Sequence, residues 1–157
     1  MLTLLYRRAA LLCLLGVSSF AFSQTPVVEK AMTYELAKTA MEAAEASARA
    51  NGWRLTIIVA DDTGMPVMLH RMNGASTGSY NIALRKAMTV ATAKMSTAEY
   101  GQKLQAGSVT EIENGVTFAG GVPVMRDGVL IGVVAASGAR AAEDEIASLA
   151  GAATIEN

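Results

Sequence analysis

The stretch Phe118–Gly138, FAGGVPVMRDGVLIGVVAASG, decides the fold of this chain. It holds two apolar runs, Val122–Met125 and Val129–Ala136, with Arg-Asp-Gly between them. Asp-Gly between apolar runs predicts a β-hairpin. The second run is almost continuously apolar, which is typical of a central strand covered on both faces.

Two glycines and a proline open this hairpin. Gly120-Gly121 allows the backbone to bend, or allows another group to approach it closely. Pro123 has no backbone N–H, so we expect it at a strand start or on an edge strand. The three residues are therefore candidates for a ligand-facing bend, and the alternative is a hairpin with a purely structural role.

Local patterns elsewhere predict the remaining elements. We expect a helix capped by Thr33 that ends near Ala50, and a helix over residues 80–95. The Ser96–Glu99 capping box predicts a short helix to about residue 105, and the last helix should span residues 142–150. Strands are expected at residues 53–60, 65–72 and 116–118, besides the two strands of the hairpin.

The predicted order is therefore α-β-β-α-α-β-β-β-α. Tight turns join neighbouring strands, so the sheet should be largely antiparallel and five-stranded, with helices packed on it. We expect one α+β domain over residues 24–157. In the strand at residues 65–72, alternation places Met68, His70 and Met72 on one face. It places Val67, Leu69 and Arg71 on the other.

Residues 1–23 have the pattern of a signal peptide. Arg7 and Arg8 precede the apolar run Ala9–Val17, and Ala21-Phe22-Ser23 offers small residues for cleavage before Gln24. The run is too short to span a membrane. We therefore expect a periplasmic or secreted protein with no membrane span after cleavage.

The composition of the mature chain excludes several classes of protein. Loss of Arg7 and Arg8 takes the 13 basic residues to 11 against 14 acidic, a net charge of −3. A mildly acidic chain without a basic run is not expected to bind nucleic acid or anionic membranes. Cys13 is the only cysteine and leaves with the signal peptide, so neither a disulfide nor a cysteine nucleophile is expected.

Hydrolase and nucleotide chemistry have little support. His70 is the only histidine, so a serine triad would have to combine it with a serine and an acid that orients it. A zinc site would need several His, Cys or carboxylate ligands. Neither a dinucleotide-binding motif nor a phosphate-binding loop occurs. Imidazole chemistry, if there is any, depends on His70.

The neighbours of His70 indicate a metal or haem-iron ligand. An imidazole between Met68 and Met72 on one strand face combines ligand types found at haem iron and at Cu(I). The alternative is a half-buried histidine beside two core methionines, because methionine often fills cores. Arg71 on the opposite face and Lys86 could neutralise a haem propionate or another carboxylate. They could equally be surface cations.

Several phrases together resemble the GlcG/HbpS-like family, over about residues 53–151. The matching segments are HRMNGA at 70–75, IALRKA at 82–87, GGVP at 120–123, IGVVAASG at 131–138 and the spaced residues Asp144, Ala147, Ala150 and Gly151. Asn73 stands where the family usually has Asp, and Ala139 replaces the last glycine of its phrase. The histidine is not part of the family's arginine-methionine phrase.

The resemblance implies a compact α+β domain that assembles into oligomers. It also implies that some members are exported haem-binding proteins and others are accessory proteins, without a shared set of catalytic residues. The favoured function is an exported homo-oligomer that binds haem or a similar carboxylate-bearing molecule. Residues 68–72, 80–86 and 120–123 would form the pocket walls.

Three alternatives remain open. The protein could be an enzyme, or an accessory protein of one, that acts on a small organic acid held by Arg71 and Lys86, with Glu111 or Asp144 moving protons. It could carry copper through Met68, His70 and Met72. It could also be a structural oligomer with an incidental pocket.

Overall fold

The computed structural model describes residues 31–155. The predicted signal peptide, Cys13 and the cleavage site before Gln24 lie outside these residues. The described elements are α1 (Tyr34–Ala50), β1 (Thr56–Asp61), β2 (Pro66–Arg71), α2 (Thr77–Ala93), α3 (Thr97–Gln105), β3 (Gly121–Arg126), β4 (Val129–Ser137) and α4 (Ala141–Ala152). They form a single α+β domain with an antiparallel sheet in the order β2-β1-β4-β3.

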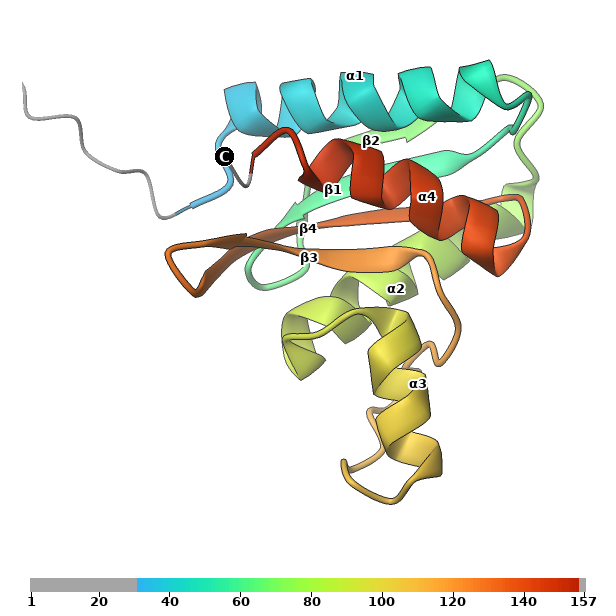
Figure 1. The fold of residues 1–157 in the computed structure, drawn as a ribbon. Helices are drawn as coiled ribbons and strands as arrows, with labels where there is room; N and C mark the ends of the chain where they lie inside the picture. The colour runs from blue at the N-terminus through green and yellow to red at the C-terminus, as the bar shows by residue number, and fades with distance from the viewer. Residues whose placement is uncertain (1–30, 156–157) are drawn as a thin grey trace, which may run out of the picture.

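The sheet separates two helical layers (Figure 1). Helices α1 and α4 cover one face, α2 covers the other, and α3 lies beyond α2. Alternation along β1 supplies both layers of the core. Ile57 and Val59 pack in the cluster beneath α1 and α4, and Ile58 and Ala60 pack in the cluster beneath α2. No helix within residues 31–155 is long and apolar enough to cross a membrane.

The predicted hairpin is confirmed. Strands β3 and β4 pair antiparallel, and the turn residues Asp127 and Gly128 have φ values of 51° and 75°. Two successive positive φ angles match the right-handed twist of the strands, which explains the Asp-Gly pair. Strand β4 is buried after its first residue and lies between β1 and β3, as its continuous apolar run predicted.

The predicted helix starts agree closely with the structure. The side chain of Thr33 accepts a hydrogen bond from Leu36 N at the start of α1, and Ser96 accepts one from Glu99 N at the start of α3. Helix α2 begins at Thr77, three residues before the predicted start at Tyr80. These agreements follow because capping depends on residues only three positions apart.

The strand predicted at residues 116–118 is wrong: the sheet of the described chain has four strands, not five. Instead of pairing with a strand, Val116 N donates a hydrogen bond to Thr89 Oγ1 on α2. The next residue, Thr117, packs its backbone closely against Gly101 on α3. Residues of α2 and α3 therefore hold this segment, and it does not extend the sheet.

Alternation along β2 is confirmed in its second half and interrupted in its first. Met68 and His70 pair with Val59 and Ile57, whose side chains face α1 and α4. A register shift at Val59/Ala60 breaks the pattern just before, so Val67 and Met68 both pack against the same core cluster. This bulge corrects the predicted position of Val67 on the opposite face.

Candidate functional site

A buried ion pair crosses from one helical layer to the other at the start of β3. Lys86 on α2 donates from Nζ to Asp144 Oδ2 on α4 and to the carbonyl oxygen of Ala136 on β4, each at 2.8 Å. The Lys86 side chain is fully buried and that of Asp144 is almost so. A charge that is never exposed needs such partners, because its desolvation would otherwise be prohibitive.

Gly120 and Gly121 form the floor of this site. The carbonyl oxygen of Gly120 accepts hydrogen bonds from Ala136 N at 2.8 Å and from Ser148 Oγ on α4 at 2.9 Å. Gly121 N donates to Thr97 Oγ1 on α3 at 3.1 Å. Gly120 has a φ of 122°, which a residue with a side chain rarely adopts. The glycine pair predicted as a bend therefore joins the sheet to three helices.

Burial shifts the pKa of both members of the pair toward the neutral form. Desolvation raises the pKa of the Asp144 carboxyl, and the hydrogen bond and charge of Lys86 oppose that rise. Desolvation also lowers the pKa of the Lys86 ammonium, against the opposing effect of Asp144. The Asp144 carboxylate is further held by Ala139 N, which donates to Oδ1 at 3.0 Å. Both charges are thus costly to bury and fixed in position.

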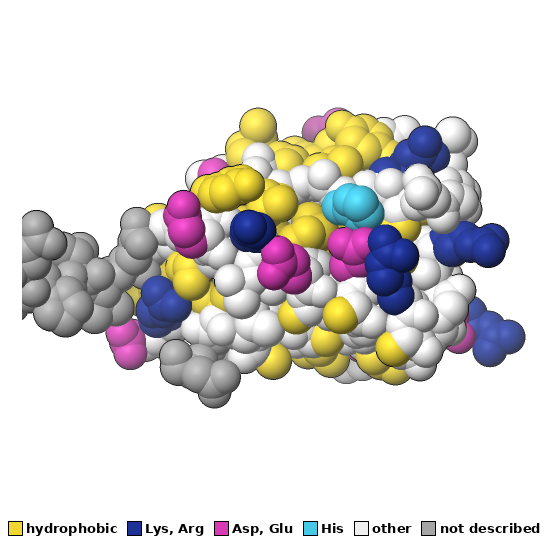
Figure 2. Space-filling view, turned by 90° about the horizontal axis from the view of Figure 1, so that it is seen from above, with side chains coloured by type: hydrophobic (Ala, Val, Ile, Leu, Met, Phe, Trp, Pro, Cys, Tyr) yellow, Lys and Arg dark blue, Asp and Glu magenta, His cyan; other side chains and the backbone are white. Residues whose placement is uncertain are grey.

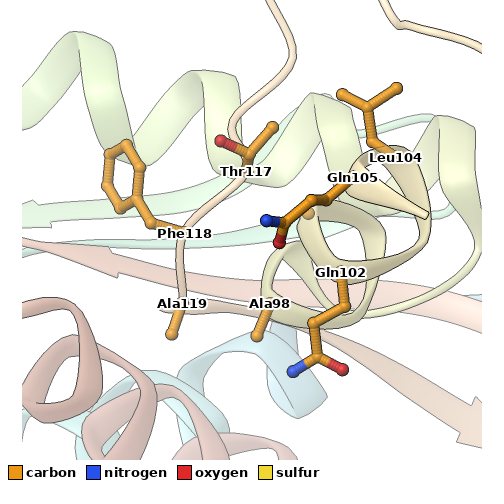
Figure 3. A pocket seen from close by; sticks show the side chains of 8 residues that line it. Ala98, Gln102, Leu104, Gln105, Thr117, Phe118 and Ala119 are labelled. Atoms are coloured by element: carbon orange, nitrogen blue, oxygen red, sulfur yellow. The ribbon is translucent and has the colours of Figure 1, made fainter. Parts of the chain in front are cut away.

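Phe118 covers the ammonium from outside. Its ring centroid lies 5.1 Å from Lys86 Nζ, and the side chain is 46% exposed. On the other side of residues 117–119 lies an open cavity of ≈ 560 Å³, which α3 lines. Figure 3 shows the Phe118 ring turned away from α3 and the amide of Gln105 pointing toward residues 117–119. The cavity is lined by Ala98, Gly101, Gln102, Leu104, Gln105, Thr117, Phe118 and Ala119.

His70 lies at the opposite edge of the sheet, on β2. Its Nε2 is 3.6 Å from Glu45 Oε1 on α1, and the same oxygen accepts a hydrogen bond from Arg49 Nε at 2.8 Å. Figure 2 shows the imidazole at the surface between charged and apolar side chains. Nearby, residues around the start of β1 and the end of β2 line a cavity of ≈ 260 Å³. These are Arg49, Gly52, Trp53, Arg54, Met72 and Asn73.

The predicted site residues therefore fall into two groups. Lys86, Gly120 and Gly121 meet at the buried pair, and Pro123 lies two residues into the same edge strand, β3. Met68, His70 and Arg71 belong to β2, at the other edge, and Met72 follows it. The three predicted pocket walls do not converge within one chain.

The side chains of the β2 group also have different surroundings. Arg71 faces the α2 side and donates to the carbonyl oxygen of Ala75 at 3.0 Å. Met72 is buried, and its Sδ accepts a hydrogen bond from Leu55 N at 3.5 Å. Residues 31–155 contain no group of three or more His, Cys, Asp or Glu side chains arranged to hold a metal ion.

Three site residues were missed from the sequence: Phe118, Thr97 and Ser148. Ser148 had a detectable signal, because it lies four residues after Asp144 among the small apolar residues of the last helix. Polar residues at that spacing share one face of a helix. Phe118 and Thr97 had no local signal of this kind.

The family model described as "Haem degrading protein HbpS-like" matches residues 32–153. This chain belongs to the HbpS-like family. Protein GlcG of Escherichia coli strain K12 is 31% identical over 108 residues, which cover 68% of this chain and 81% of GlcG. The resemblance found in the five sequence phrases is thereby confirmed.

Solved structures of the family have the same fold. A crystal structure of HbpS matches with a TM-score of 0.74 and 32% identity, covering 81% of this chain and 92% of HbpS. A crystal structure of the PduOC:Heme complex matches with a TM-score of 0.73 and 27% identity, covering 80% of this chain and 95% of PduOC.

Proposed function

We propose that this protein binds haem, or a similar carboxylate-bearing planar molecule, and acts as an exported oligomeric binding protein. The observation that carries the proposal is the likeness to PduOC, which has been crystallised with heme and shares its fold over most of this chain. The family description also names haem. Export is supported by the signal-peptide pattern in residues 1–23.

The surface around His70 has the chemistry that haem requires. The imidazole is partly exposed, with a side-chain exposure of 42%. Arg49 and Arg54 line the adjoining cavity and could pair with two propionates. Trp53, in the same cavity, offers an aromatic surface for the macrocycle. These residues replace the predicted pairing of Arg71 with Lys86, since Arg71 lies on β2 and Lys86 is buried in the other group of site residues.

The free edge of β2 and the neighbouring face of α2 would form the contact between subunits of an oligomer. That strand is at the edge of the sheet, where its outward backbone N–H and C=O groups can pair with a strand of another chain. Large apolar side chains are exposed on β2 and α2: Leu69 at 41%, Tyr80 at 42% and Met88 at 51%. Exposed apolar groups of this size are typical of protein interfaces. Sedimentation of the mature protein would give the oligomeric state.

Haem titration of the mature protein, from Gln24 onward, tests the proposal. We expect saturable binding with a shift of the Soret band, loss of that spectrum in His70→Ala and weaker binding in Arg49→Ala/Arg54→Ala. Lys38→Ala, which removes another exposed cation from α1, is the matched control and should bind as the wild type does. Unsaturable binding in all variants would reject haem binding. An unchanged spectrum in His70→Ala would reject His70 as the iron ligand.

A further inference from the structure

We propose that Lys86 is the anchor of a second, gated site for a small monocarboxylate, with the Phe118 ring as its gate. The Lys86 ammonium has three N–H donors. Ala136 O and Asp144 Oδ2 accept two of them. No other described oxygen accepts the third, and the Phe118 ring covers the ammonium on its outer side. A carboxylate oxygen that replaced the ring would complete the set of acceptors.

The residues beside the ring supply further donors. Within the described chain, the backbone N–H groups of Phe118 and Ala119 donate to no protein acceptor. Adjacent free N–H groups favour an acceptor-bearing, negatively charged ligand. A Cβ at Gly120 would lie 2.2 Å from Lys86 Nζ, so the glycine leaves room for the ammonium beside this backbone. The site therefore presents donors to its ligand. Its nearest carboxylate, Asp144, is already held by Lys86 and Ala139 N, and Glu143 and Glu145 on α4 add negative charge at longer range.

The cavity beside α3 gives the ring a place to move. Phe118 is already partly exposed, and the cavity of ≈ 560 Å³ across residues 117–119 exceeds the size of one aromatic ring. Rotation of the side chain toward α3 would uncover Lys86 without moving the sheet. The ring position in this structure is then the closed state, and the ligand binds the open one.

The carboxylate could come from a free small acid or from a haem propionate, and the experiment separates these sources. Sodium acetate is titrated into ¹⁵N-labelled mature protein at constant ionic strength, with sodium chloride and neutral acetamide as controls. We expect saturable shifts at the Phe118 and Ala119 amides with acetate alone. Equal shifts with chloride, or equal binding of acetamide, would overturn the proposed carboxylate site.

Variants test the gate and the anchor separately. Phe118→Ala should tighten acetate binding about tenfold or more if the open state is a minor population. Leu149→Ala, which removes an exposed side chain from α4, should leave it unchanged. Lys86→Met/Asp144→Leu removes both buried charges together so that the fold is kept, and it should abolish binding. Acetate binding retained by a folded double variant, or unaltered by Phe118→Ala, would overturn the proposal.

The last part of the experiment adds haem to the acetate titration. If the His70→Ala variant loses haem and still binds acetate, the two sites are independent, and failure of one proposal leaves the other standing. If wild-type protein binds both ligands at once, the Lys86 site takes a free small acid. If haem displaces acetate from the Phe118 and Ala119 amides, the carboxylate that reaches Lys86 is a propionate.

Discussion

The ammonium of Lys86 occupies the place where a side chain at Gly120 would begin. A Cβ on Gly120 would lie 2.2 Å from Lys86 Nζ and 2.8 Å from Asp144 Cβ. Helices α2 and α4, on opposite faces of the sheet, are joined through this gap. The glycine is therefore required by the ion pair, and not by the turn alone.

Gly120→Ala should destabilise the fold by more than about 3 kcal/mol, because the buried ammonium would lose its contact with Asp144. Gly52→Ala is the matched control: Gly52 also has a positive φ, 72°, but no atom lies within 4 Å of its Cβ position. That change should cost about 1 kcal/mol, the backbone contribution alone. Chemical denaturation measures both. Equal losses would show that the Gly120 contact with Lys86 contributes nothing.

Lys86→Met should cost about 3–5 kcal/mol, since it leaves the Asp144 carboxylate buried without its counter-charge. Replacing both members, as Lys86→Met/Asp144→Leu, should recover this loss, because apolar pairs often substitute for buried ion pairs without cost. Free energies of unfolding of the wild type, Lys86→Met, Asp144→Leu and the double variant give the coupling free energy. A double variant no more stable than the single one would mean that the loss arises from packing rather than from charge.

The stability of the wild type and that of the same double variant should depend differently on pH. The raised pKa of Asp144 stabilises the fold fully below its unfolded value of 3.8, and that stability is lost as the pH rises through the folded pKa. The lowered pKa of Lys86 stabilises the fold fully above its unfolded value of 10.5, and that stability is lost as the pH falls through the folded pKa. Relative to the double variant, the wild type should therefore be least stable between these two windows, near neutral pH. Thermal unfolding of both proteins across the pH range measures the difference, and a maximum near neutrality would contradict it.

Gly101→Ala should displace the segment that carries Phe118. A Cβ on Gly101 would lie 2.0 Å from the carbonyl oxygen of Thr117, so α3 and this segment cannot keep their present contact. Gly78→Ala, near the start of α2, is the control, because nothing lies within 4 Å of its Cβ position. It should stabilise the protein by about 0.5–1 kcal/mol, as alanine favours helices over glycine. Amide hydrogen exchange at Val116 and Gly121, whose N–H groups donate to Thr89 and Thr97, should rise in Gly101→Ala only. Unchanged exchange there would show that the contact does not hold the segment.

Local patterns predicted local structure well. The Asp127-Gly128 turn and the caps at Thr33 and Ser96 were all visible in the sequence, because each depends on residues a few positions apart. The segment Val116-Thr117-Phe118 was misinterpreted as a strand for a related reason. Its partners, Thr89 and Gly101, are helical residues far away in the sequence, so no local pattern could show them.

The Lys86–Asp144 ion pair shows why the candidate site could be predicted only in part from the sequence. Lys86 was predicted as a ligand-binding cation and Asp144 only as one possible proton carrier, although they are direct partners 58 positions apart. The strand order is equally non-local: β1 pairs with β4, which places β2 and β3 at opposite edges. For that reason the predicted walls around His70 and around Gly120 do not meet within one chain. Composition and alternation fix which face a residue occupies, and not which strand lies next to it.

Glu45 offers a test of His70 that does not remove the imidazole. Its carboxylate lies 3.6 Å from His70 Nε2, and it also holds Arg49. A haem ligated by His70 must displace this carboxylate, whose charge also opposes the propionates. Glu45→Ala should therefore tighten haem binding, by about tenfold if the released interaction is worth about 1.4 kcal/mol. Glu42→Ala, one turn earlier on α1 and paired only with Lys38 at 4.0 Å, should change little. Soret titrations of the two variants give the comparison. Weaker binding in Glu45→Ala would mean that Glu45 holds Arg49 in place for the ligand, and equal affinities would show that haem does not bind through His70.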